Sequence, residues 1–150
     1  MKRELTTVLL ALALTGLTFR AGAADTGAAV NPSGTWSLTT TSGTNVTSPQ
    51  TLKLKLEGGK LTGTLSRQAG YKVEQLPLLD AKIKGSEISF ATHNYAVSYV
   101  NKVQQPTDTN KWSHSKFQGA ISGDTMKGKV ERESFMTSLR TLDWEAKRVK

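Results

Sequence analysis

Two-residue alternation of apolar and polar side chains runs through most of this chain and restricts it to a β-sheet fold. Apolar residues occupy every second position from Leu52 to Leu56 and again from Leu142 to Ala146. Alternation with this period places one set of side chains on each face of a strand. After residue 33, no window long enough for a helix shows a 3.6-residue period. The chain is therefore predicted to be all-β.

A β-hairpin motif occurs three times in the chain. Residues 55–65, 82–92 and 120–130 align without gaps, with an apolar residue second, glycine fourth and another apolar residue seventh. Glycine tolerates the positive φ angles that tight hairpin turns require. We expect three hairpins whose apolar side chains face one interior. Gly63 and Gly128, inside two of these segments, are expected to mark bends or the close approach of a bulky neighbour.

The same alternation predicts eight or nine strands joined by short connections. We expect them at about 34–41, 50–57, 60–66, 71–76, 79–84, 87–100, 112–121, 125–133 and 139–148. A meander of this length, with no helix to cover it, would leave two solvated edges and an exposed apolar face. Closure into an antiparallel up-and-down barrel of eight or nine strands removes both problems. A two-sheet β-sandwich is the alternative architecture.

The N-terminal residues have the pattern of a secretory signal. Lys2 and Arg3 precede an apolar stretch from Val8 to Phe19, and residues 21–23 supply an Ala-x-Ala cleavage site. A membrane-spanning helix needs roughly 20 apolar residues, more than this stretch contains. Cleavage after residue 23 is therefore favoured over a retained anchor. We expect an exported protein, periplasmic or secreted, with no transmembrane segment in the mature chain.

Export divides the chain into a signal peptide (1–23), a flexible arm (24–32) and a single β-domain (33–150). The net charge is +8, and the signal segment holds only three of the 20 basic and one of the 12 acidic residues. A basic domain is attracted to anionic surfaces. Its lysines alternate with apolar residues, as on a solvated sheet face, so no specific nucleic-acid partner is expected. The chain has no cysteine, which excludes a lipoprotein anchor, disulfides and Cys-ligated metals.

Motifs at both ends of the predicted domain are similar to those of known barrels. They read Gly-Thr-Trp at 34–36, Leu-Thr-Gly-Thr at 61–64, Gly-Asp-x-x-Lys-Gly-Lys at 123–129 and Trp-Glu-Ala-Lys-Arg at 144–148. This pattern resembles the lipocalin and calycin families, and small secreted bacterial β-barrel proteins without an assigned activity. The resemblance implies a barrel closed at one end by Trp36, with a basic residue of the last strand on its ring. Arg148, on the same strand face as Trp144, is expected to make that cation–π contact. The oligomeric state stays open.

Aromatic residues around the longest predicted hairpin form the candidate binding site. Rings with a polar group suit the stacking of a ligand or a glycan. The candidates for the rim or lumen are Tyr71, Phe90, Tyr95, Tyr99, Trp112, His114 and Phe117. His93 is expected to approach His114 across the hairpin, with Asp108 as a third donor. Their spacing matches no metal motif, so neither a metal nor a cofactor is predicted.

The sequence favours binding over catalysis. It contains no Gly-x-Ser-x-Gly motif, and most acidic residues fall at turns or outward positions. The leading hypothesis is a non-catalytic exported binding module for a small apolar or amphipathic ligand in the barrel mouth or lumen. The alternative is an envelope or extracellular interaction domain that uses its basic outer face or aromatic hairpin on glycans or protein partners. A sugar-active hydrolase is the third. An interior cavity of roughly 300 Å³ or more would favour the first hypothesis, and a filled interior would favour the second.

Overall fold

The computed structural model describes residues 30–96, 99–101, 103–104 and 108–150. The predicted signal peptide and most of the predicted arm lie outside the described residues. Twelve strands form within the described ranges: β1 (Gly34–Ser42), β2 (Asn45–Val46), β3 (Gln50–Glu57), β4 (Lys60–Ala69), β5 (Lys72–Pro77), β6 (Leu79–Lys84), β7 (Glu87–Ala96), β8 (Tyr99–Val100), β9 (Val103–Gln104), β10 (Asp108–Ser122), β11 (Thr125–Ser134) and β12 (Thr137–Arg148).

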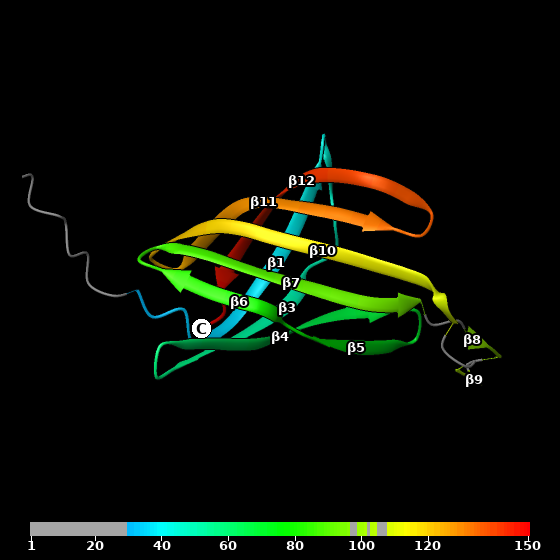
Figure 1. The fold of residues 1–150 in the computed structure, drawn as a ribbon, viewed down its shortest axis with the longest axis horizontal. Helices are drawn as coiled ribbons and strands as arrows, with labels where there is room; N and C mark the ends of the chain where they lie inside the picture. The colour runs from blue at the N-terminus through cyan, green and yellow to red at the C-terminus, as the bar shows by residue number, and fades with distance from the viewer. Residues whose placement is uncertain (1–29, 97–98, 102, 105–107) are drawn as a thin grey trace, which may run out of the picture.

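Nine of these strands form one antiparallel sheet that curls into a nearly closed barrel (Figure 1). The strand order is β5-β4-β3-β1-β12-β11-β10-β7-β6, with β2 paired to β1 beside this path. Strands β8 and β9 form a separate two-stranded ribbon between β7 and β10. The predicted all-β barrel is therefore confirmed, with the larger of the two expected strand numbers. The main sheet is continuous, which leaves no second sheet for the sandwich alternative.

The barrel has one unsealed seam, where β5 and β6 form the two edges of the sheet. β5 pairs with β4, and β6 pairs with β7 only from Leu79 opposite Ala91 to Lys84 opposite Glu87. Pro77 ends β5 and has no N–H to extend a ladder, and the next amide, that of Leu78, donates to the carbonyl of Gly63 at 3.0 Å. The chain thus leaves β4 and joins β7 in the middle of the seam. Residues 92–96 pair with β10 alone.

Two predicted strand boundaries were wrong. The strand expected at 87–100 ends at Ala96, and β10 begins at Asp108, earlier than the expected residue 112. The register between β7 and β10 shifts between Asp108 and Trp112, which marks a bulge. In the sequence, alternating apolar residues continue from Tyr95 to Val100, past the end of β7, so the pattern gave no sign of the break.

Apolar side chains fill one half of the barrel interior. The buried core residues are Trp36, Leu38, Leu52, Leu54, Leu61, Leu65, Ile88, Phe90, Phe117, Ile121, Met126, Val130, Trp144 and Ala146. Phe90 stacks on Phe117 with ring centroids 4.6 Å apart, and the Trp144 ring meets both of them edge-on. We call this half, with the β3–β4, β6–β7 and β10–β11 turns, the closed end.

The bulky neighbour expected near Gly128 is Trp144. Gly128 pairs with Gly119 in the register of β10 and β11, and a Cβ on Gly119 would lie 2.7 Å from Cζ2 of Trp144. The Trp144 Nε1 donates to the carbonyls of Gln118 and Lys129, both at 3.1 Å. A side chain at Gly119 would therefore collide with the indole, and one at Gly128 would collide with the backbone of Gln118 and Gly119.

The two chain ends of the domain are joined at the closed end by Arg148. Its Cζ lies 4.2 Å from the centroid of the Trp36 ring, so the predicted cation–π contact is present. The guanidinium also donates to the carbonyl of Ser33 at 2.6 Å and to Asp124 at 3.0 Å. Gly34 has φ +134°, and a Cβ there would lie 2.8 Å from the Arg148 Nη1. The Gly-x-Trp motif therefore leaves room for the arginine that covers the tryptophan.

Replacing Trp36 with alanine is expected to lower the free energy of unfolding by about 3 kcal/mol or more. Trp36 is fully buried, and its Nε1 donates to the Pro32 carbonyl at 2.9 Å, so the change creates a cavity and frees a buried acceptor. Urea melts would measure the loss. Val46→Ala, at a position 63% exposed, is the control. A loss below about 1 kcal/mol for Trp36→Ala, the size of an ordinary surface effect, would contradict this role.

Candidate functional site

A small polar pocket lies inside the barrel, next to the aromatic core. Its volume is about 80 Å³. It is lined by Gln50, Leu65, Arg67, Leu76, Thr92, Asn94, Ser113, Ser115, Phe117 and Arg132. Three of these residues are apolar and buried, and the other seven are polar or charged. The lining strands include β4, β5 and β7, so the pocket lies beside the unsealed seam. We call this half of the barrel the open end.

Strand alternation places the charged residues of the open end inside the barrel. Arg67 follows buried Leu65 by two residues, and Arg132 follows buried Val130 by the same step. Glu74 precedes buried Leu76 by two residues on β5. Because side chains two apart on a strand share a face, these charges continue the inward rows whose deeper members form the core. The interior therefore changes from apolar to charged within one step along three strands.

Arg67 and Glu74 form a tight ion pair across β4 and β5, where they are register partners. The Nε and Nη2 atoms of Arg67 donate to Oε2 of Glu74 at 3.1 and 2.9 Å. Their side chains are only 32% and 16% exposed. Two hydrogen bonds to one carboxylate satisfy part of the Arg67 fork and hold its position. Glu74 is thus already engaged by a cation.

Arg132 has no such partner. Among the described residues its side chain makes no hydrogen bond or ion pair, and its register neighbours on β10 and β12 are Ser115 and Arg140. Burial lowers the pKa of the Arg132 guanidinium below its usual value, and the positive charge of Arg67 lowers this pKa further. Both causes oppose the charged form, which arginine nevertheless keeps at neutral pH. The pocket therefore holds an uncompensated cation.

Neutral hydrogen-bonding groups surround this cation. Thr92 and Ser115 are 5% and 9% exposed, and their hydroxyl groups can donate to an acceptor in the pocket. Ser113 donates to the Asn94 amide oxygen, which orients that amide. An oxyanion entering the pocket would meet a guanidinium and several donors, while the carboxylate of Glu74 stays with Arg67. The arrangement is chemically suited to a small anion.

The residues predicted as ligand candidates lie in separate places and do not form one site. Phe90 and Phe117 belong to the buried core, with Phe117 also at the edge of the pocket. Tyr71 is 72% exposed at the turn between β4 and β5. Tyr99 lies on β8, and its side chain is outside the described part of the chain. The remaining three candidates lie on the outer face of the barrel.

That outer-face group is a ring cluster on β7 and β10. His93 lies 5.1 Å from Tyr95, 6.3 Å from Trp112 and 5.9 Å from His114, measured between ring centroids. The predicted approach of the two histidines across the hairpin is present. Within the described ranges, no group of three or more His, Cys, Asp or Glu is placed to hold a metal ion.

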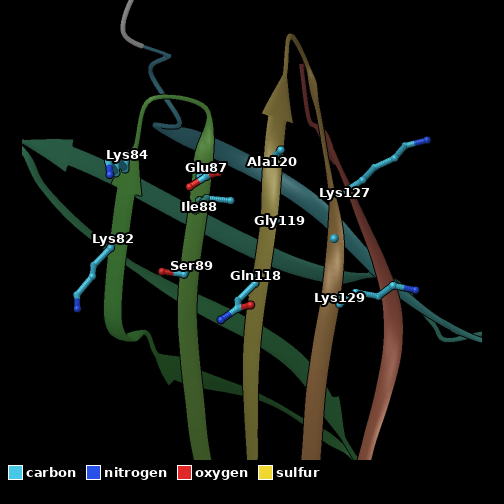
Figure 2. A pocket seen from close by; sticks show the side chains of 11 residues that line it. Lys82, Lys84, Glu87, Ile88, Ser89, Gln118, Gly119, Ala120, Lys127 and Lys129 are labelled. Atoms are coloured by element: carbon cyan, nitrogen blue, oxygen red, sulfur yellow. The ribbon is translucent and has the colours of Figure 1, made fainter.

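A wider hollow of about 760 Å³ lies on the outer face of β6, β7, β10 and β11 (Figure 2). Figure 2 shows Lys82 on one side and Lys127 and Lys129 on the other, with their side chains pointing away from each other. Lys129 pairs with Asp143 at 2.6 Å, and Lys127 approaches Glu145 at 3.4 Å. These amines diverge, and two of them are partly neutralised, as expected of a solvated sheet face.

Comparison of the sequence with family models finds no match, and comparisons with curated proteins and with solved structures find none either. Within the described residues, no helix has the length and apolar character needed to cross a bilayer. The function is therefore inferred from the geometry of the pocket and of the surface.

Sequence reasoning missed the residues that carry charge into the pocket. Most acidic residues were expected at turns or outward positions, and Arg132, which lies between Glu131 and Glu133, was given no inward role. Counting two residues onward from Val130 would have placed Arg132 inside. The same count from Leu65 leads to Arg67. The two-residue alternation continues through both strands, but its inward positions change from apolar to charged at Arg67 and Arg132.

Replacing Arg132 with methionine is expected to leave the melting temperature of the ligand-free protein unchanged or to raise it by up to about 4 °C. The change removes a half-buried charge that has no partner and is repelled by Arg67. Differential scanning calorimetry at low salt would measure the shift. A large fall in melting temperature would mean that Arg132 is held by an interaction that supports the fold.

Proposed function

We propose that this protein is an exported, lipocalin-like, non-catalytic binding module that holds the anionic head of a small amphipathic ligand in its open end. The observation that carries the proposal is the half-buried Arg132 guanidinium, which has no carboxylate partner among the described residues. A cation in this position lowers the stability of the fold, and a bound anion would offset that loss by pairing with it. Sites that sacrifice stability in this way are commonly functional.

The dimensions of the pocket favour a small ligand. Its volume of about 80 Å³ holds an anionic group and a short apolar part beside Leu65, Leu76 and Phe117. The pocket is below the roughly 300 Å³ that would have favoured a carrier of drug-sized ligands, so the proposal is limited to small anions. The aromatic core occupies the rest of the described interior. A large, purely apolar ligand is therefore the less favoured version of the carrier hypothesis.

The charge arrangement favours binding over hydrolysis. Glu74 is the carboxylate nearest to the pocket in the register of β4 and β5, and it accepts two hydrogen bonds from Arg67. A sugar hydrolase would need a second acid across a cleft from the first. The inward positions across the pocket hold Arg132 and hydroxyl groups instead.

The ring cluster on the outer face supports a second candidate function. Tyr95 is 41% exposed beside His93 and Trp112, and such a group of rings can stack on a sugar. Binding of glycans at this cluster would fit the interaction-domain hypothesis. It ranks second because its rings lie on the outer face of the sheet, whereas the Arg132 guanidinium is half-buried inside the barrel.

The proposal predicts that small carboxylates stabilise the protein more than their neutral amides. Butyrate and butyramide have the same size, as do acetate and acetamide, so the difference between each pair isolates the charge. A ligand at 100 times its Kd stabilises the folded state by about 2.7 kcal/mol. Melting curves over a concentration series would give the affinities.

Arg132→Gln is expected to weaken carboxylate binding by roughly tenfold or more, because a hydrogen bond to a charged group is lost. Lys84→Gln is the matched control, since it removes the same charge from an exposed position outside the barrel. Equal stabilisation by carboxylates and amides, or equal carboxylate affinity in the two variants, would contradict the proposal.

A further inference from the structure

The two ends of the barrel differ in the side chains that their turns expose. At the closed end, the turns are Gly58-Gly59, Gly85-Ser86 and Gly123-Asp124, all small or polar. At the other end, the β11–β12 turn consists of Phe135 and Met136, which are 44% and 78% exposed. Tight hairpin turns favour Gly, Asn and Asp, so turn geometry does not explain a Phe-Met pair.

Apolar side chains are exposed on three hairpins at the open end. We define the apolar rim as Tyr71, Val73, Val100, Val103, Phe135, Met136 and Leu139, each of which is exposed. In Figure 1 the β4–β5 turn, the β8–β9 ribbon and the β11–β12 turn all lie toward the right-hand end of the molecule. Exposed apolar residues gathered at one end of a protein usually mark an interaction surface.

Basic side chains accompany the apolar rim. Lys72 follows Tyr71, Arg140 follows Leu139, and Lys111 lies on the first part of β10; all three are exposed. Of the carboxylates described at this end, Glu74 is paired with Arg67, and Glu133 lies half-buried on the outer face. Apolar tips with adjacent cations match an anionic bilayer, where apolar groups enter the interface and cations meet lipid phosphates.

We propose that the apolar rim docks the protein on an anionic lipid surface. The tips enter the headgroup region, and Lys72 and Arg140 lie against the lipid headgroups. In this arrangement the hairpin ends of the apolar rim enter the interface, and no strand or helix crosses the bilayer. The proposal does not depend on ligand binding, although docking at this end would bring the pocket to the membrane.

Vesicle flotation tests the proposal with the protein as recovered after export. The wild type is expected to float with vesicles of phosphatidylglycerol and phosphatidylcholine and to stay behind with phosphatidylcholine alone. The double change Phe135→Ser and Met136→Ser is expected to lower the bound-to-free ratio by roughly tenfold. Arg140→Gln is expected to lower this ratio by roughly fivefold.

Two control variants carry matched changes at the closed end. Val149→Ser removes an apolar side chain that is 52% exposed, and Lys60→Gln removes a charge from the β3–β4 turn. Both variants have the same N-terminal segment as the rim variants, so any contribution of that segment to vesicle binding is equal in the two sets. The proposal fails if the wild type does not bind anionic vesicles. It also fails if the closed-end variants lose as much binding as the rim variants.

A label at each end gives an independent readout of orientation. Because the chain has no cysteine, Met136→Cys and Ser86→Cys each accept one environment-sensitive fluorophore. The label at 136 is expected to shift to shorter wavelength with anionic vesicles, and the label at 86 is expected not to shift. The reverse pattern, or equal shifts, would overturn the proposed orientation. Thermal melts of each variant confirm that it is folded before the comparison.

Discussion

The contact between Arg148 and Trp36 ties the two chain ends of the domain together at the closed end, where it reinforces the backbone ladder that pairs β1 with β12. β1 and β12 are adjacent in the sheet, with Trp36 opposite Arg148 in the register. The guanidinium lies over the indole and also bonds to the segment before β1 and to Asp124 in the β10–β11 turn. One side chain therefore fixes the N-terminal segment, the last strand and a turn. At the opposite end, the inward side chains become polar and charged.

The fold could be predicted from the sequence because strand alternation and turn glycines are local signals. The hairpins around Gly58, Gly85 and Gly123 were each specified by about ten residues, and each of these glycines has a positive φ. The seam was not predictable in the same way. It depends on Pro77 and on the amide of Leu78, which bonds to Gly63 on a strand already paired with β5. Whether a barrel seals depends on strand stagger around the whole sheet, which no local pattern records.

The candidate site was harder to predict than the fold, because aromatic residues were interpreted as an indication of ligand binding. Phe90, Phe117 and Trp144 instead pack on each other and fill the closed end. Large rings in a narrow barrel serve as core residues first, since they bury the most apolar area. The residues left for binding are the ones that break the inward apolar rows, such as Arg67 and Arg132. An inward position that changes from apolar to charged is therefore a better sign of a site in this fold than an aromatic residue.

The same division explains why charge and stability oppose each other in this barrel. The closed end satisfies its polar groups: the indole N–H groups of Trp36 and Trp144 both donate to carbonyls, and Arg148 is fully engaged. At the open end, Arg67 pairs with the inward carboxylate of Glu74, and Arg132 stays half-buried beside a like charge without a carboxylate partner among the described residues. A second inward acid on β7 or β10 would have neutralised Arg132, but these positions hold Thr92, Asn94, Ser113 and Ser115. Hydroxyl and amide groups can donate hydrogen bonds to an anion, but they carry no negative charge that would neutralise Arg132. The guanidinium therefore stays available for an anionic ligand.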